Sequence, residues 1–306
     1  MLEEDSGLRH LAGKVARHWR WGRQGSWASL VEEDDLRPVR RATRAWRKWR
    51  WRQSNAVAAE TAAPIWLVGV QRSGTNMVVR GLEERPEVEV HNENDRAAFQ
   101  RFRLRPDPVV REIILKSGHR YVLFKPLCDS HRVDELLALD TPTPGRAIWA
   151  YRGVDGRVRS ALAKFGDTNL RVLTEIAAGR GGDLWQAQRL SPESLELIAS
   201  FDWTAMSPAS AAALFWYVRN RLFFDLGLDR RDDVLLSSYE AVVADPEAGT
   251  GALASFLDLE WEPSLAAHIE RRDEREPPPL ELDTRVRRLC DDLQERLEAR
   301  TPSAGP

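Results

Sequence analysis

PIWLVGVQRSGTNMVVRGL, from Pro64 to Leu82, is the segment from which the architecture of this chain can be inferred. Ile65–Val68 is a short apolar run, which is typical of a strand buried on both faces. Gly69–Gly74 predicts a tight turn, and apolar residues return at helical spacing from Thr75 to Leu82. A strand, turn and helix in this order direct backbone N–H groups and a helix N-terminus toward one point, where an anion is stabilised. The stretch therefore predicts an anion-binding loop.

This loop lacks the residues with which an ATP- or GTP-binding P-loop holds magnesium. Such a loop reads G-x-x-x-x-G-K-[ST]. Gly69 and Gly74 keep the glycine spacing, but Thr75 and Asn76 follow them, and the positive charge lies earlier, at Arg72. The sequence also offers no cluster of metal-ligating residues. We therefore expect a phosphate-binding loop that works without a metal ion.

Working outward from the loop, short apolar runs alternate with segments of helical spacing. The further strands that we predict are Val88–Val90, Tyr121–Phe124, Ala147–Tyr151 and Val234–Ser237, and the helices include Asp155–Phe165, Pro208–Leu226 and Pro246–Leu257. This alternation predicts an α/β fold of P-loop-like, three-layer type, with a central parallel sheet flanked by helices. Ligands of such folds bind at the carboxyl ends of the strands.

Composition divides the 306 residues into three parts: a helical N-terminal extension (1–60), a main domain (61–270) and a C-terminal helical tail (271–306). Cys128 and Cys290 lie far apart and do not suggest a disulfide framework. The N-terminus is charged, without the apolar core of a secretory signal, and no apolar run is long enough to span a bilayer. We therefore expect a cytoplasmic protein.

The extension is basic and rich in tryptophan. Residues 1–55 hold 13 Lys or Arg against 7 Asp or Glu, and six of the 12 tryptophans. Residues 36–52 predict an amphipathic helix with Trp46 and Trp49 on one face. That helix can lie on an anionic membrane surface, or it can pack its Trp face on its own domain. We favour packing and leave peripheral membrane contact open, and we expect no nucleic acid because no base-stacking fold accompanies the segment.

Four pieces of sequence, in order, carry a resemblance to a known family. They are VQRSGTN from Val70, RPEVEVHNE from Arg85, AIWAYRGVDGRVRS from Ala147 and LLSSYEAVVADP from Leu235. Together they resemble the sulfotransferases that use 3′-phosphoadenosine 5′-phosphosulfate (PAPS), over about Pro64 to Ile269, and are more similar to the bacterial and tyrosylprotein branches. The resemblance implies transfer of a sulfuryl group from PAPS to a hydroxyl of an acceptor.

By this resemblance, the donor would contact the first loop through its 5′-phosphosulfate, an arginine–serine pair through its 3′-phosphate, and a tyrosine beside its adenine. These residues are Arg72, Ser73, Gly74, Thr75 and Asn76 for the loop, Arg152 and Ser160 for the pair, and Tyr239. Backbone N–H groups and a guanidinium fixed in this way would stabilise charge that develops on the leaving phosphate. The family usually has Thr where this chain has Asn76, and Arg-Asp-Pro where it has Arg152-Gly153-Val154.

The resemblance also implies the catalytic residues. Glu93 stands where the tyrosylprotein branch has its general base, and Arg72 and Lys125 would stabilise charge in the transition state. His91 competes with Glu93, because it lies two residues earlier on the same strand face and histidine is the base of the cytosolic branch. We favour Glu93 by position. Lys125 can alternatively be read as a strand-edge lysine with no chemical role.

Two other functions remain as alternatives: a P-loop kinase or nucleotide hydrolase, and a non-catalytic module with a sulfotransferase-like fold. The first would need the lysine and serine that Thr75 and Asn76 replace. The acceptor is open among carbohydrates, glycolipids and small molecules, with walls expected from residues 94–120 and 166–208.

Overall fold

The computed structural model describes residues 38–55, 57–271 and 278–301. The chain divides into two compact units, residues 1–51 and 52–306, and each is considered by itself. Of the predicted extension, residues 1–37 and 56 lie outside the described residues. The helix expected over residues 36–52 is found as α3 (Pro38–Ser54). None of the described helices is both long enough and apolar enough to cross a lipid bilayer.

The second unit is built on a parallel sheet of five strands in the order β2-β5-β1-β6-β7. The strands are β1 (Ala63–Gly69), β2 (Val88–His91), β5 (Tyr121–Phe124), β6 (Arg146–Tyr151) and β7 (Val234–Ser238). All five lie where the apolar runs predicted them. β2 and β5 lie on one side of β1, and β6 and β7 lie on the other. The carboxyl end of β1 is therefore the point at which the strand order reverses. Open α/β sheets bind their ligands at such a point.

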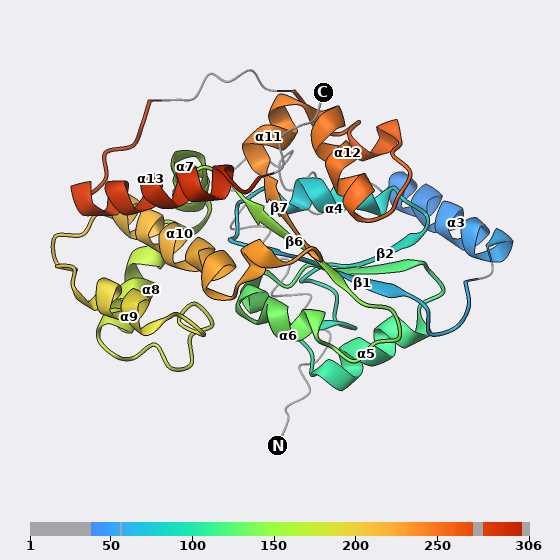
Figure 1. Ribbon diagram of the computed structural model, residues 1–306, viewed down its shortest axis with the longest axis horizontal. Coiled ribbons are helices and arrows are strands. Elements are labelled where there is room, and N and C mark those ends of the chain that lie inside the picture. Colours follow the sequence, from blue (N-terminus) through green and yellow to red (C-terminus); the bar gives the residue numbers. More distant parts are fainter. Residues whose placement is uncertain (1–37, 56, 272–277, 302–306) are drawn as a thin grey trace. The chain divides into compact units, whose positions relative to one another are not determined.

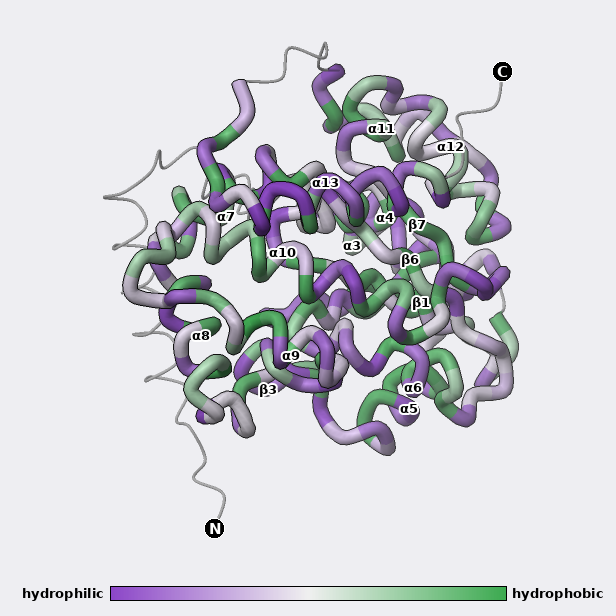
Figure 2. Tube along the Cα trace, turned by 60° about the vertical axis from the view of Figure 1, so that its left-hand side comes forward, coloured by the Kyte–Doolittle hydropathy of each residue, from purple (hydrophilic) through white to green (hydrophobic). Residues whose placement is uncertain are grey.

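Helices cover both faces of the sheet, which confirms the predicted three-layer α/β fold (Figure 1). Trp66 and Val68 of β1 belong to a core with α10 (Pro208–Asp225) and α13 (Thr284–Glu298). Ile65 and Leu67 face the opposite core, with α4 (Thr75–Glu83) and α12 (Pro246–Phe256). Because side chains alternate along a strand, a continuous apolar run supplies both cores at once. Figure 2 shows this hydrophobic stretch of β1 in the interior of the fold.

The other described elements connect these layers. They are α5 (Asp107–Lys116), η1 (Leu127–Arg132), α6 (Val133–Leu137), α7 (Val154–Phe165), α8 (Thr168–Ala177), α9 (Pro192–Ala199), η2 (Leu228–Arg230), α11 (Tyr239–Ala244), η3 (Pro263–Leu265), and an antiparallel hairpin of β3 (Phe99–Gln100) with β4 (Arg103–Leu104). Local sequence explains several helix starts. Ser191 and Ser207 each accept a hydrogen bond from the backbone N–H three residues later, and a proline follows each of them.

The C-terminal helix α13 is part of the main core. Its residues Val286, Cys290, Leu293 and Leu297 recur every three or four positions and are buried against α10 and α7. The guanidinium of Arg287 binds both carboxylate oxygens of Asp155 on α7, at 2.8 and 2.9 Å. The described part of the predicted tail, residues 278–301, therefore packs closely against the helix that follows β6.

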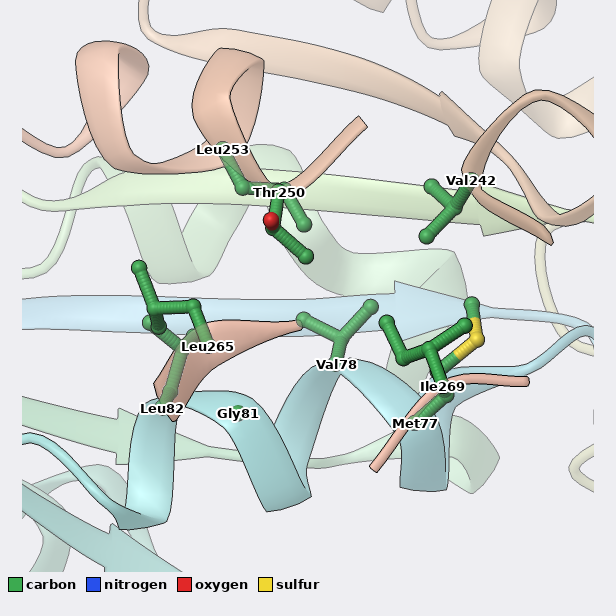
Figure 3. Close-up of a pocket in the computed structure, with 9 residues that line it drawn as sticks. All are labelled: Met77, Val78, Gly81, Leu82, Val242, Thr250, Leu253, Leu265 and Ile269. Atoms are coloured by element: carbon green, nitrogen blue, oxygen red, sulfur yellow. The ribbon is translucent and has the colours of Figure 1, made fainter. Parts of the chain in front are cut away.

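A cavity of about 10 Å³ separates α4 from α11 and α12 (Figure 3). Its walls are apolar, apart from Thr250, whose hydroxyl already donates to the carbonyl of Pro246 at 2.6 Å. A space of this size holds at most about one water, and a water needs polar partners. The cavity is a packing gap between apolar side chains along α4.

Candidate active site

The loop between β1 and α4 has a backbone that narrows the choice of residues. Gly69, Arg72 and Gly74 all have positive φ, at 128°, 72° and 83°. A Cβ on Gly69 would lie 2.1 Å from the carbonyl oxygen of Ala150, so only glycine fits there. Arg72 adopts the left-handed conformation without being glycine, which costs on the order of 1 kcal/mol. Strain of this kind is typical of functional loops.

Two residues that the sequence did not identify as anchors hold this loop. Ser130 of η1 accepts a hydrogen bond from the N–H of Gly69 at 3.0 Å. Arg157 of α7, fully buried, donates from Nε to the carbonyl oxygen of Gln71 at 3.3 Å. The loop is therefore fixed at its start by η1 and in its middle by α7. Arg157 lies on the same helix face as the buried Val154, Val158 and Ala161, a spacing that is visible in the sequence.

Arg157 also brings a buried positive charge to the back of the loop. Its other hydrogen bonds are to neutral groups, the carbonyl of Ala212 at 2.8 Å and the amide oxygen of Asn169 at 3.4 Å. Burial and the nearby charge of Arg72 lower the pKa of Arg157 to about 9. Two neighbouring guanidiniums, one of them desolvated, create a strong attraction for an anion.

Arg72 reaches the side of α7. Its Nε donates to the hydroxyl of Ser160 at 2.9 Å. Ser160 lies one turn after Gly156, and these positions share a helix face. The side chain of Arg152 crosses that same face, because a Cβ on Gly156 would lie 2.8 Å from Arg152 Nε. Arg72 and Arg152 thus lie along one side of α7, and Ser160, predicted to pair with Arg152, contacts Arg72.

Arg152 itself is held at the end of β6. Its guanidinium lies 4.3 Å from the ring centroid of Tyr239, and its carbonyl oxygen accepts from the indole of Trp216 at 2.8 Å. Arg152 Nε is 3.8 Å from a carboxylate oxygen of Glu240. The Tyr239 ring in turn packs on the loop, where a Cβ on Gly74 would lie 2.6 Å from it. The predicted adenine-side tyrosine therefore joins Arg152 to the loop.

Two buried polar atoms, at the loop and beside the face of α7, lack a hydrogen-bond partner within the described parts of the chain. They are the hydroxyl of Ser73, on a residue only 2% exposed, and Nε of Arg152. Buried donors without a partner are rare in folded proteins and point to a water, an ion or a ligand. Their place on the loop and beside the face of α7 fits a ligand that accepts hydrogen bonds there.

On the other side of the loop, Asn76 connects to the predicted catalytic pair. Lys125, 7% exposed, donates from Nζ to the amide oxygen of Asn76 at 2.7 Å and lies 3.6 Å from a carboxylate oxygen of Glu93. Burial raises the pKa of Glu93, and the charge of Lys125 opposes that shift. A carboxylate with a raised pKa is a stronger base than an exposed one, and the charge of Lys125 favours its ionised form.

His91 lies in a different electrostatic environment. Its Nδ1 is 2.6 Å from Asp95 and its Nε2 is 3.3 Å from Glu89. Burial alone would lower the pKa of His91, but its hydrogen bonds to Asp95 and Glu89 raise it to about 9. The imidazole is then a cation at neutral pH, with both nitrogens facing carboxylates. A cation cannot accept a proton, so the geometry favours Glu93 over His91 as the base.

The structure therefore gathers the predicted residues into three contacting groups around one loop: Arg72 with Ser160; Gly74 with Tyr239 and Arg152; and Asn76 with Lys125 and Glu93. Thr75, which is buried, begins α4.

No protein-family model matches the sequence, and no curated protein matches it. The backbone resembles solved sulfotransferases. One is the sulfotransferase domain of a Synechococcus olefin synthase, 14% identical, covering 78% of this chain and 98% of that domain with a TM-score of 0.41. Another is a sulfotransferase from Alicyclobacillus acidocaldarius, 14% identical over 80% and 94% of the two chains, with a TM-score of 0.43. A third is the sulfotransferase domain of the curacin biosynthetic pathway, 12% identical over 77% and 99%, with a TM-score of 0.44. These likenesses concern the backbone fold.

Proposed function

We propose that this protein is a sulfotransferase that moves a sulfuryl group from PAPS to a hydroxyl group of an acceptor. One observation carries the proposal. The strained loop holds the buried Ser73 hydroxyl, which has no hydrogen-bond partner among the described residues. Arginines lie along α7 on one side of the loop, and a lysine–glutamate pair, reached through Asn76, lies on the other. This arrangement offers a site for an anionic donor directly beside a base.

On this proposal the loop residues Arg72–Asn76 would hold the 5′-phosphosulfate, Arg152 and Ser160 the 3′-phosphate, and Tyr239 the adenine. Bound PAPS supplies an activated sulfuryl group on a phosphate that can leave. The chain supplies fixed charge: the guanidinium of Arg72, kept in place by Ser160, and the loop N–H groups stabilise the negative charge that grows on the phosphate. Because these groups are positioned beforehand, little reorganisation is needed during the reaction.

Glu93 would take the proton of the acceptor hydroxyl as that oxygen attacks sulfur. Lys125 orients this carboxylate and also binds the amide oxygen of Asn76. It thereby links the base to the loop that holds the donor, and its charge stabilises the transition state. A carbohydrate, a glycolipid or a small molecule with an accessible hydroxyl would serve as acceptor.

The test is a transfer assay. Full-length protein is incubated with sulfur-35-labelled PAPS and a panel of sugars, glycolipids and phenols, and labelled products are separated by chromatography. We expect at least one labelled product from the wild type and a loss of about 10²-fold or more in Glu93→Gln, because the proton acceptor is gone. Glu247→Gln, an exposed glutamate on α12, is the matched control and should keep the wild-type rate. A Glu93→Gln rate near that of the wild type would refute the assigned base.

We also propose that α3 makes peripheral contact with anionic membranes. Trp46 and Trp49 are 54% and 52% exposed and lie three residues apart, so they share a helix face. The helix carries seven Arg or Lys and no Asp or Glu. Tryptophan beside dense positive charge is suited to the headgroup region of an anionic bilayer.

Vesicle sedimentation tests this contact. Full-length protein should pellet with vesicles of phosphatidylcholine and phosphatidylglycerol at low salt, but not with phosphatidylcholine alone. Replacing both Trp46 and Trp49 with serine should abolish pelleting. Equal pelleting by the double variant would show that this face is not the contact, and no pelleting of the wild type would favour packing within the protein.

A further inference from the structure

Arg152, which the proposed function assigns to the 3′-phosphate, lies between the end of β6 and the start of α7. Two side chains from distant elements accept hydrogen bonds from the backbone there. Glu240 of α11 accepts a hydrogen bond from the N–H of Gly153 with both carboxylate oxygens, each at 3.1 Å. Gln294 of α13 accepts from the N–H of Val154 at 3.0 Å. The N-terminal N–H groups of a helix have no partner within the helix. At the start of α7, two of them are already taken by the protein.

These hydrogen bonds limit where the anionic group of a ligand can bind. An anion at the end of α7 would compete with Glu240 and Gln294 for the N–H groups of Gly153 and Val154. The positive groups available to it lie instead along the side of the helix, where Arg152 crosses Gly156 and Arg72 meets Ser160. A 3′-phosphate is therefore expected at the side face of α7, which makes the placement of the Arg152 side chain decisive.

The placement of Arg152 is set by its immediate neighbours. Glu240 fixes the peptide that follows Arg152 and also lies 3.8 Å from Arg152 Nε, while the ring of Tyr239 supports the guanidinium. Gly156 leaves the space that the side chain occupies. A side chain that is already in its bound position loses less conformational freedom on binding.

We propose that Glu240 is a positioning residue for the 3′-phosphate, which acts by holding Arg152 through the Gly153 backbone. Glu240 and Gln294 together tie α11 and α13 to this end of the donor site. The inference rests on the proposed function, because it requires an adenosine 3′,5′-bisphosphate ligand. Its mechanism is geometric: the carboxylate repels a phosphate, so its benefit must come from the hydrogen bonds that it accepts.

The experiment compares two ligands on the full-length chain by titration calorimetry. Adenosine 3′,5′-bisphosphate (PAP) and adenosine 5′-monophosphate (AMP) differ only in the 3′-phosphate. The dissociation constant of AMP divided by that of PAP therefore isolates the contribution of this phosphate. We expect Glu240→Ala to lower this ratio by about tenfold, the loss expected for a misplaced charge-assisted contact, with AMP affinity nearly unchanged. Glu240→Gln keeps an acceptor oxygen for Gly153 and should retain the wild-type ratio or exceed it.

A second variant tests the position of Arg152 without touching Glu240. Gly156→Ala adds a methyl group where Arg152 Nε lies and should also lower the PAP-to-AMP preference. It should not lower the melting temperature, because alanine favours a helix over glycine. Glu247→Ala, on the exposed side of α12, is the control and should change neither affinity.

The outcomes separate this inference from the proposed function. A wild type that does not prefer PAP over AMP would overturn both. A wild-type preference that survives in Glu240→Ala, or equal weakening of PAP and AMP, would overturn the positioning role alone. If Glu240→Ala does not fold, Gly156→Ala provides the test. An unchanged ratio of the AMP and PAP dissociation constants in Gly156→Ala would refute the claim that Arg152 is held in position before the ligand binds.

Discussion

At the residue scale, Arg72 combines strain with charge. It holds a left-handed backbone conformation and lies beside the buried charge of Arg157, while its Nε binds Ser160. Backbone strain and like-charge repulsion both raise the free energy of the unliganded protein. We therefore expect an anionic ligand whose binding offsets this cost. The stability of the loop and its function should therefore respond to mutation in opposite directions.

Arg72→Gly is predicted to leave the unfolding midpoint unchanged or higher while PAP affinity falls by about tenfold or more, because the substitution relieves strain and like-charge repulsion but removes a phosphate ligand. Thermal denaturation and calorimetry measure the two effects. Arg101→Gly is the control, since Arg101 also has positive φ, at 51°, but lies in the turn of the β3–β4 hairpin. A clear drop in stability for Arg72→Gly would contradict this account.

His91 gives a prediction on pH. Its folded pKa of about 9 lies above the ordinary value of 6.5, so its ion pairs stabilise the fold fully below pH 6.5 and are lost as the pH rises through 9. Denaturant unfolding should show wild type losing roughly 3 kcal/mol relative to His91→Gln between these limits. Parallel curves for the two proteins would show that His91 is neutral in the folded state and restore it as a candidate base.

At the element scale, the helix α4 that begins at the loop is fixed by a close backbone contact at its other end. A Cβ on Gly81 would lie 2.7 Å from the carbonyl oxygen of Leu265, in the segment that closes the apolar core behind α4 (Figure 3). The position of the loop therefore depends on how closely this helix approaches η3.

Gly81→Ala is predicted to destabilise the protein by about 1–3 kcal/mol, because the added methyl group overlaps a backbone atom and outweighs the gain in helix propensity. Gly251→Ala on α12 is the matched control: the nearest atom to its Cβ is 3.9 Å away, so it should be neutral or stabilising. Denaturant unfolding of both variants measures the difference. Equal stability of the two would mean that α4 can move away from Leu265 without cost.

Strands and helices could be predicted where a local sequence pattern marks them. Contacts between residues far apart in the sequence could not. The central strands β1, β5 and β6 each contain a continuous apolar run, since burial on both faces forces that composition, whereas the edge strand β2 carries Glu89 between two valines. The β3–β4 hairpin was not predicted, because two-residue strands carry no period. Ser130 and Arg157, which hold the loop, act across 61 and 86 residues, and nothing local marks such anchors. For the same reason the pairing of Ser160 with Arg72 emerged only from the fold.

At the scale of the whole molecule, one sheet edge brings together segments from the length of the second unit. The loop after β1, the strand end of β6, the start of α11 and the C-terminal helix α13 meet around Arg152. Most of the residues that meet here belong to the sequence motifs. The involvement of α13 was not predicted, because Gln294 belongs to no motif and reaches Val154 across 140 residues.

We propose that this site takes a nucleotide with a 3′-phosphate, and calorimetric titration of PAP into the full-length protein is the decisive experiment. The titration is run in EDTA, and ATP is titrated with and without magnesium for comparison. We predict that PAP binds in EDTA, that Arg152→Ala weakens this binding by about tenfold or more, and that magnesium does not create a tight ATP site. Absence of PAP binding, or ATP binding that appears only with magnesium, would contradict the account and favour a P-loop nucleotide enzyme.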